Sequence, residues 1–359
     1  MSDINTFNWN NQPIKIYKKN EKYILHILLF IATFFTTAIA GVQWANKDFT
    51  DLLNWHYGIT YAVLILTFLS AHEFGHYFAA KFHKVDTTLP YYIPMPIPYL
   101  NFFGTFGAVI KTRSPFNSKK ALFDIGVAGP LAGFVVCFIF LLYGLMTLPP
   151  IDYLYNIHPE YLSKYHGVIS TKGLHFGDTI LYQLMANLFA NPKGFLPPMN
   201  ELYHYPFLNV GWFGMFVTSL NMLPIGQLDG GHVTYAMFGK RIQGLIARIF
   251  WWMMIILGLG TVLSLLYQQL QINEPGQVYI IIQSALLPFL DFIKHNFNWY
   301  FMGWGGWLFW AFITRIFIKI DHPPIAEEGE LDDKRKFLGW VALVILVVCF
   351  AYNGIYILE

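Results

Sequence analysis

Two histidines and a glutamate, His72, Glu73 and His76, have the types and spacing that best support chemistry in this chain. They form the sequence HEFGH inside the apolar segment 57–80, in which Glu73 is the one formally charged side chain. Two histidines four residues apart lie on one face of a helix, at the spacing needed to bind a single zinc ion. The glutamate beside the first histidine can activate a water molecule on that ion. The segment therefore indicates hydrolytic chemistry at zinc.

The position of Glu73 indicates where this chemistry takes place. Segment 57–80 is long enough to cross a bilayer, and an ionisable group in a membrane helix is costly enough to indicate function. A structural alternative stays open, since a histidine on an apolar face is usually a satisfied core residue. A chance HExxH, however, is expected in roughly one such sequence in a hundred. Motif and apolar segment together predict hydrolysis inside a membrane.

The composition is that of a membrane protein. The 359 residues are 55% hydrophobic and 12% charged, against about 25% charged in a soluble domain. Apolar runs of about 20 residues, the length that spans a bilayer, occur at 23–46, 57–80, 125–150, 207–228, 249–271, 297–314 and 337–358. We therefore expect an all-α polytopic membrane protein with about seven transmembrane helices. The net charge of +2 gives no reason to expect a nucleic-acid partner.

Three features of the apolar runs have their own interpretation. The stretch 275–290 is short and contains Pro288, so it is expected to be re-entrant or interfacial rather than spanning. The first run is too long for a signal peptide and lacks a small-residue cleavage site, so it should remain as an anchor. Cys137 and Cys349 lie in apolar runs and are interpreted as small hydrophobic residues rather than as a disulfide.

The basic residues indicate how these helices are oriented, because positive charges favour cytoplasmic loops. With the N-terminus inside and seven spans, 18 of the 23 lysines and arginines lie in inside segments. The remaining five lie outside, at Lys47, Lys164, Lys172, Lys193 and Lys294. This split predicts a cytoplasmic N-terminus and an outer C-terminus. His72 would then lie about 13 Å from the cytoplasmic end of its helix, in the inner half of the bilayer.

A zinc site on this helix needs at least one more ligand from elsewhere, and Asp229 is the best candidate. It follows the uncharged run 207–228, at the inner end of the fourth expected span. Pro224 and Gly226 should break this helix, and a broken helix in a membrane is tolerated only against protein or a wet cavity. An ordinary helix end is the alternative interpretation, and His232 is a less favoured substitute ligand.

These motifs together resemble the site-2 protease family of intramembrane zinc metalloproteases. The resemblance rests on HEFGH, on the segment from Asn221 through Pro224 to Asp229 and Gly230, and on GVAGP at 126–130 between them. It covers roughly residues 52–242, with weaker similarity in the C-terminal spans. The paired motifs, in this order and in membrane segments, are highly specific.

The resemblance implies a role for each matching residue. His72, His76 and Asp229 would bind Zn²⁺, and Glu73 would be the base that deprotonates a bound water. Asn221 would hold the substrate carbonyl or the developing oxyanion, a role that suits a neutral amide donor. Two neutral imidazoles and one carboxylate would leave the zinc ion with a net positive charge and an open position for water.

The segment 101–110 is expected to present substrate to this site. It is rich in aromatic and β-branched residues and punctuated by glycine, and prolines precede it, which argues against a helix. In the family, the matching segment is a membrane-embedded β-hairpin whose edge strand is expected to pair with extended substrate, by β-strand addition. The residues expected to contact substrate are Gly104, Thr105, Phe106, Gly107, Ala108 and Val109. An interfacial loop with aromatic anchors is the alternative.

The expected organisation is a cytoplasmic segment 1–22, a transmembrane anchor 23–46, a protease core 52–242 and C-terminal transmembrane helices 243–359. By resemblance, the protein would be a zinc endopeptidase of a bacterial cytoplasmic membrane that cuts within or next to transmembrane segments. The implied substrates are a membrane-anchored anti-sigma factor or transcription regulator, or a remnant signal peptide. A catalytically silent zinc-binding membrane protein or transporter is the alternative, and the intact Glu73 argues against it. The sequence leaves the substrate and the oligomeric state open.

Overall fold

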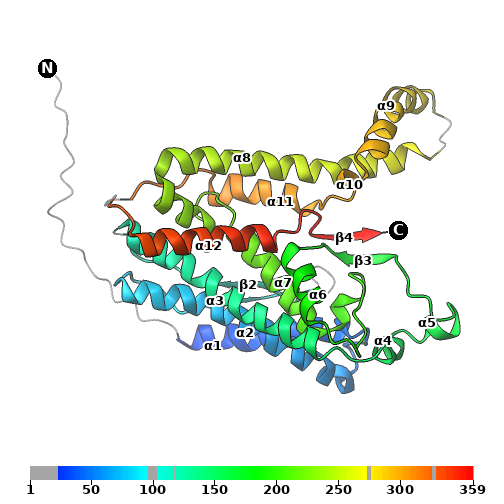
Figure 1. The fold of residues 1–359 in the computed structure, drawn as a ribbon, viewed down its shortest axis with the longest axis horizontal. Helices are drawn as coiled ribbons and strands as arrows, with labels where there is room; N and C mark the ends of the chain where they lie inside the picture. Colours follow the sequence, from blue (N-terminus) through cyan, green and yellow to red (C-terminus); the bar gives the residue numbers. More distant parts are fainter. Residues whose placement is uncertain (1–22, 96–102, 117, 273–275, 326–328, 359) are drawn as a thin grey trace.

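The computed structural model describes residues 23–95, 103–116, 118–272, 276–325 and 329–358. These residues are mostly helical, as the sequence predicts. Long helices run along one common direction and form the body of the molecule, and shorter elements gather at one end (Figure 1). The expected cytoplasmic segment 1–22 lies outside the described residues.

Three helices form the first part of the bundle. They are α1 (Tyr23–Trp44), α2 (Trp55–Phe82, preceded by the 3-10 turn η1, Leu52–Asn54) and α3 (Lys119–Met146). α2 packs against both α1 and α3. Glycine brings the backbones of α1 and α2 together, since a Cβ on Gly58 would lie 1.9 Å from the carbonyl oxygen of Ala38. Small residues at such contacts are typical of helices that pack within lipid.

The second part of the bundle is built from α7 (Pro206–Asn221), α8 (Asp229–Leu270), α11 (Gly306–Ile313), the π-helical turn η3 (Thr314–Ile318) and α12 (Asp333–Cys349). α8 consists of two helical pieces that meet at a kink, where Gly239 has a φ of 77° and a ψ of 171°. α3 contacts α7, α8 and α12 as well as α2, so it lies at the centre of the bundle. Large buried side chains such as Trp212 and Trp307 fill the core.

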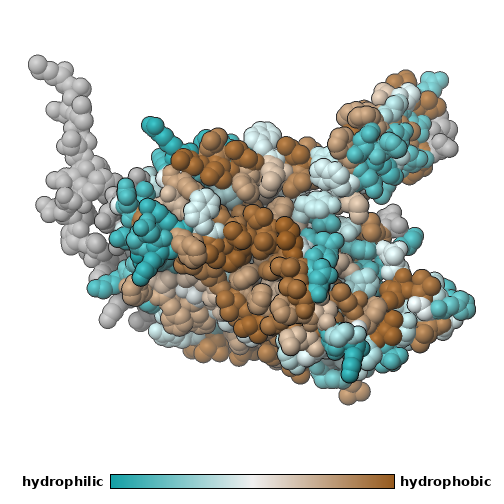
Figure 2. Space-filling view, in the orientation of Figure 1, coloured by the Kyte–Doolittle hydropathy of each residue, from teal (hydrophilic) through white to brown (hydrophobic). Residues whose placement is uncertain are grey.

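At one end of the bundle, charged side chains connect three helices. Asp124 of α3 accepts a hydrogen bond from Arg335 of α12 at 2.6 Å, and His83 at the end of α2 lies 2.7 Å from the same Oδ2 atom. Arg335 also binds Asp332, the N-cap of α12. Figure 2 shows hydrophilic side chains gathered at the left end of the molecule and a broad apolar area over the middle of this face. Exposed apolar side chains on this bundle include Trp252 of α8.

Five helical segments among the described residues are long and apolar enough to cross a membrane: α1, η1 with α2, α3, α8 and α9 (Gln277–Asn296). The expected count of seven is not confirmed, because α7, α11 and α12 have only 16, 8 and 17 residues. α9 overlaps the stretch that was expected to be re-entrant or interfacial. It is a helix of 20 residues that projects beyond the end of α8 (Figure 1).

The segment 101–110 contributes, in its described part, one strand of a hairpin. β2 (Thr105–Val109) pairs antiparallel with β1 (Tyr91–Pro94). The register shifts between the two ends of the ladder, and Gly107 takes a φ of 97°, the left-handed conformation that such a bulge often requires. β1 packs on α1, and β2 packs on α2, so the hairpin lies beside the helix that carries HEFGH.

The other end of the bundle carries the short elements. They are α4 (Asp152–Ile157), α5 (Glu160–Ser163), β3 (Gly173–Phe176), α6 (Ile180–Phe189), the 3-10 turn η2 (Leu202–His204), α10 (Asn298–Phe301) and β4 (Ile355–Leu358). β3 and β4 pair antiparallel, so the last apolar run, 337–358, is a helix only as far as Cys349. Cys137 and Cys349 are both buried and unbridged, in agreement with their interpretation as small hydrophobic residues.

Candidate metal centre

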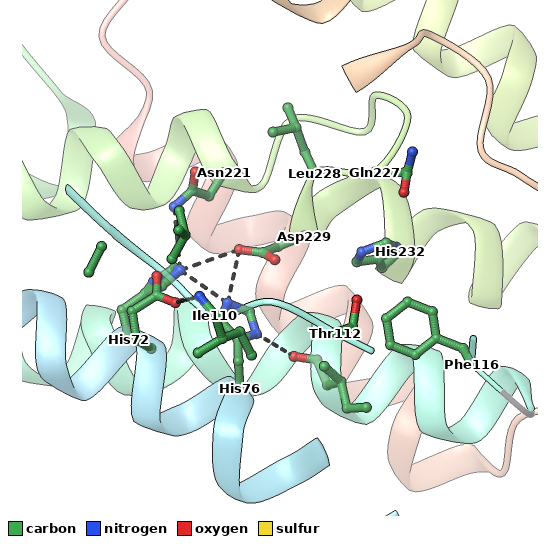
Figure 3. A pocket seen from close by; sticks show the side chains of 14 residues that line it. His72, His76, Ile110, Thr112, Phe116, Asn221, Gln227, Leu228, Asp229 and His232 are labelled. Atoms are coloured by element: carbon green, nitrogen blue, oxygen red, sulfur yellow. Dashed lines mark hydrogen bonds and ion pairs between the residues drawn. The ribbon is translucent and has the colours of Figure 1, made fainter. Parts of the chain in front are cut away.

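Three side chains that bind metals converge from two helices that are distant in the sequence. His72 and His76 lie on one face of α2, and Asp229 is the first residue of α8. The two Nε2 atoms are 3.1 Å apart, and Asp229 Oδ2 lies 3.4 Å from that of His72 and 3.3 Å from that of His76 (Figure 3). The structure thus brings together the three residues that the sequence predicts as ligands.

The spacing of these donors and the protonation of His76 fit a tetrahedral zinc ion. Bonds of about 2.0–2.1 Å at tetrahedral angles place ligand atoms about 3.3 Å apart, close to the three distances observed. His76 Nδ1 donates to the carbonyl oxygen of Ile125 at 2.7 Å, since a carbonyl can only accept. In the neutral ring, this bond leaves a lone pair on Nε2, which faces the other two donors. Electron-rich atoms that converge in a buried place call for a cation between them.

A tight loop delivers Asp229 to the histidines. α7 ends at Asn221, close to the break that the sequence predicts. Gly226 takes a φ of 49° and donates its N–H to the carbonyl oxygen of Ile320 at 2.8 Å. This hydrogen bond fixes the loop to a segment that lies far along the chain. The first turn of α8 then packs against the end of α7 so closely that a Cβ on Gly230 would lie 1.8 Å from a backbone carbonyl oxygen.

Glycines of α3 make room for the two imidazoles. A Cβ on Gly129 would lie 2.1 Å from His76 Nε2, and a Cβ on Gly133 would lie 3.3 Å from His72 Nδ1. The GVAGP segment therefore serves close packing beside the site, and it carries no donor atom of its own there. Any larger side chain at Gly129 would displace the His76 ring.

The donors border a cavity of about 340 Å³ that also contains the other residues expected to act in catalysis. Glu73 is buried, and its Oε2 accepts the backbone N–H of Ile110 at 2.8 Å. Asn221 Nδ2 lies 3.4 Å from His72 Nε2, so its amide is directed towards the metal donors. A carboxylate, an amide and three metal-binding groups thus share one cavity.

Only part of the segment expected to contact substrate reaches this cavity. Ala108 and Val109 line it, whereas Gly104, Thr105, Phe106 and Gly107 do not. Gly104 packs against α1, where a Cβ would lie 2.4 Å from the carbonyl oxygen of Thr36. The side chain of Phe106 is largely exposed.

His232, the substitute ligand considered from the sequence, also lines the cavity. Its Nδ1 lies 2.8 Å from His322 Nε2, and it does not belong to the cluster of donors within metal-binding reach. The sequence does not predict the contact of His232 with His322, or the roles of the backbone groups of Ile110 and Ile125. Every residue has a backbone N–H and C=O, so nothing in the sequence distinguishes these two.

Comparison with known proteins places the chain among metallopeptidases. A model of peptidase family M50 matches residues 60–266, which is more than half of the chain. Over 280 residues, the chain is 26% identical to "Probable zinc metalloprotease EGY2, chloroplastic" of Oryza sativa subsp. indica, covering 72% of this chain and 47% of that protein. Over 243 residues it is 28% identical to "Probable zinc metalloprotease EGY1, chloroplastic" of Oryza sativa subsp. japonica, covering 61% and 38%. The chain thus spans less than half of the length of these two relatives.

We expect Gly129→Ala to weaken metal binding, because the new methyl group would occupy the space of the His76 ring. A displaced ligand should lower zinc affinity by about 10–100-fold, the range found when the support of a ligand is altered. Competition between the purified full chain and a fluorescent chelator would measure this. Gly144→Ala is the matched control on the same helix, since its Cβ would meet only side-chain atoms, of Leu208 and Phe207. Equal zinc affinity of Gly129→Ala and wild type would contradict the packing argument.

Proposed function

Since the chain belongs to peptidase family M50, the site-2 protease family, and is a membrane protein, we propose that it is a zinc endopeptidase that cuts within or next to transmembrane segments. One observation carries the proposal. Three metal donors lie within 3.4 Å of one another on α2 and α8, two helices long enough to span a bilayer, and Glu73 adjoins the first of them. The relatives named above are described as zinc metalloproteases, which supports zinc as the metal.

In this proposal His72, His76 and Asp229 hold the zinc ion. When bound, zinc acts as a Lewis acid that lowers the pKa of water and polarises a carbonyl group. The hydrogen bond from His76 to the carbonyl of Ile125 orients the ring. The hydrogen bond from Gly226 to the carbonyl of Ile320 fixes the loop that precedes Asp229 and so positions the Asp229 carboxylate.

Glu73 acts as the general base, and Asn221 stabilises negative charge. The N–H of Ile110 holds one oxygen of Glu73, so the carboxylate is positioned in the cavity to take a proton from the attacking water. The water oxygen bonds to the carbonyl carbon of the substrate, and Glu73 then passes the proton to the amine nitrogen as the C–N bond breaks. The Asn221 amide donates to the carbonyl oxygen, which becomes negative when the tetrahedral intermediate forms.

The helices lie across the bilayer along the long axis of Figure 1, with the apolar area of Figure 2 in the hydrocarbon region. Seven spans result when α7, α11 with η3, and α12 join α1, α2, α3 and α8, since short helices are accommodated where the bilayer thins. The basic residues support a cytoplasmic N-terminus and a site in the inner half of the bilayer. The core 52–242 then lies between the anchor 23–46 and the helices of 243–359. We assign the protein to a bacterial cytoplasmic membrane, although its named relatives are chloroplastic.

The hairpin lies within the membrane and β2 receives the substrate. β1 covers one edge of β2, and the cavity lies beside Ala108, Val109 and the N–H of Ile110. A substrate that pairs along the other edge must be extended, which exposes carbonyl groups that a helix keeps in its own hydrogen bonds. Suitable substrates are membrane-anchored regulators, such as an anti-sigma factor or transcription regulator, and remnant signal peptides.

The ligand assignment predicts that alanine at His72, His76 or Asp229 lowers the zinc content of the purified chain by about one ion, because an ion with two protein ligands binds weakly. Inductively coupled plasma mass spectrometry after dialysis would measure it. His232→Ala is the control, since this side chain lines the same cavity outside the donor cluster. If Asp229→Ala kept the full zinc content and His232→Ala lost zinc, the third ligand would be His232 and not Asp229.

The base assignment predicts that Glu73→Gln keeps zinc and loses activity. Glutamine has the size of glutamate but cannot accept the proton, so cleavage should fall by at least about 10²–10⁴-fold. The measurement is cleavage of transmembrane peptides in liposomes, with zinc content determined on the same samples. A variant that cuts as fast as wild type would remove Glu73 from this role. A wild type that binds zinc but cuts no peptide of a broad panel would favour the silent zinc-binding protein or transporter.

The strand-addition model predicts a proline effect at two neighbouring positions of β2. Successive N–H groups of a strand point to opposite edges, so one of Ala108 and Val109 directs its N–H away from β1. Proline at that position should lower cleavage at least about tenfold, since it deletes a donor to the substrate. Val109→Ile is the matched control and should cut normally, and zinc content should stay unchanged in all three variants. Wild-type cleavage by both proline variants would refute substrate pairing along this edge.

A further inference from the structure

A second cluster of metal-binding groups lies at the other end of the bundle. His158 follows α4, and Glu201 and His204 belong to the turn that precedes α7. We call these three residues the distal cluster. The two Nε2 atoms are 2.8 Å apart, and Glu201 Oε2 lies 3.4 Å from that of His204 and 3.7 Å from that of His158. Glu201 and His204 are only 2% and 4% exposed, so this is an interior site and not a surface group of charges.

The hydrogen bonds around the distal cluster leave lone pairs on both imidazoles facing inwards. His204 Nδ1 donates to the carbonyl oxygen of Trp44 at 2.5 Å, and His158 Nδ1 lies 2.8 Å from the carboxylate of Glu160. Both partners accept hydrogen bonds, so each Nδ1 carries the proton and each Nε2 of a neutral ring is a lone pair. Two nitrogen lone pairs therefore point at each other at hydrogen-bond distance.

The carboxylate of Glu201 adds a third electron-rich atom. Its Oε1 accepts hydrogen bonds from the hydroxyl of Tyr161 at 2.5 Å and from Asn200 Nδ2 at 3.2 Å. Its Oε2 is buried and has no hydrogen-bond partner within the part of the chain that the structure describes. A buried carboxylate oxygen without a donor is costly unless a cation lies beside it. This oxygen is directed at the two imidazoles.

From these contacts we propose that the distal cluster binds a second metal ion, a divalent ion of the zinc type. Two imidazoles and one carboxylate form a mixed nitrogen and oxygen donor set, which suits zinc and its transition-metal neighbours better than calcium or magnesium. The mean spacing of the donors is close to the tetrahedral edge of about 3.3 Å. The hydrogen bonds of both Nδ1 atoms to oxygen acceptors are the outer support that metal-binding histidines usually have.

The distal site is separate from the metal centre on α2. Glu201 and His204 directly precede α7, whose last residue lies at that centre, and the 16 residues of α7 span about 24 Å. Its ligands come from two places in the segment 147–205, and His204 is anchored on the last residue of α1. An ion there would tie this segment to the ends of α1 and α7. Its role is to stabilise the structure, since neither histidine nor Glu201 lines the cavity of the metal centre.

The test uses the full chain carrying His72→Ala and His76→Ala, so that the outcome does not depend on the proposed peptidase site. After removal of metal with a chelator, titration with Zn²⁺ should restore about one ion per chain. It should also raise the midpoint of thermal unfolding, because an ion that binds only the folded chain stabilises it. Replacement of zinc by Co²⁺ should give the visible absorption of a cobalt ion bound by nitrogen and oxygen.

Further substitutions in the same background identify the ligands. His158→Ala should lower zinc affinity by at least about tenfold, and Glu201→Gln, which keeps the shape but removes the charge, should also weaken it. His56→Ala is the control, since this exposed histidine near the start of α2 lies outside the cluster. His158 is the least buried of the three ligands, which is why it is chosen for truncation. Elution as a single species would show that the variant is folded. The proposal would be overturned if the chain carrying His72→Ala and His76→Ala bound no zinc, or if His56→Ala and His158→Ala lowered its zinc affinity equally. Either result would favour a proton shared between the imidazole rings of His158 and His204.

Discussion

The need to hold three electron-rich atoms together inside an apolar bundle governs the architecture around the metal centre. Two of them come from successive turns of α2, where the helical repeat places His72 and His76 on one face. The third has to arrive from α8, so α7 must end early and the chain must turn sharply before Asp229. The turn depends on glycines that fit against backbone carbonyls, and α3 contributes glycines where the imidazoles need space. The same glycines that allow close backbone packing therefore also allow the three donors to reach their positions.

The site was predictable from the sequence to the extent that it depends on side-chain type and spacing. HEFGH identifies His72 and His76, and an acidic residue after a long uncharged run with a helix break identifies Asp229. The supporting groups were not predictable. The carbonyl of Ile125 and the N–H of Ile110 are backbone atoms, and only the fold determines which backbone atoms face the site.

The mostly helical fold was predictable because uncharged runs of this length have few other options in a membrane. The ends of the helices were predictable only in part. Pro224 and Gly226 predict the break that follows α7, which ends at Asn221, but the hydrogen bond that holds the loop to the distant Ile320 has no local signal. The run 337–358 has the composition of one span, but its last residues pair with β3, which lies far away in the sequence. Hydrogen bonds between segments that are far apart in the sequence leave no pattern in the residues of either segment.

The hydrogen bond between Gly226 and Ile320 has a consequence for where a working unit of this protein can end. The family match stops at residue 266, more than fifty positions before Ile320. A shortened chain that contains the whole matched region would keep every metal donor but lose the backbone that steadies the loop before Asp229. A piece of the chain that keeps this support for Asp229 is therefore longer than the region by which the family is recognised. An exchange of C-terminal segments between relatives would keep this support only where the incoming segment places a carbonyl group at the position of Ile320.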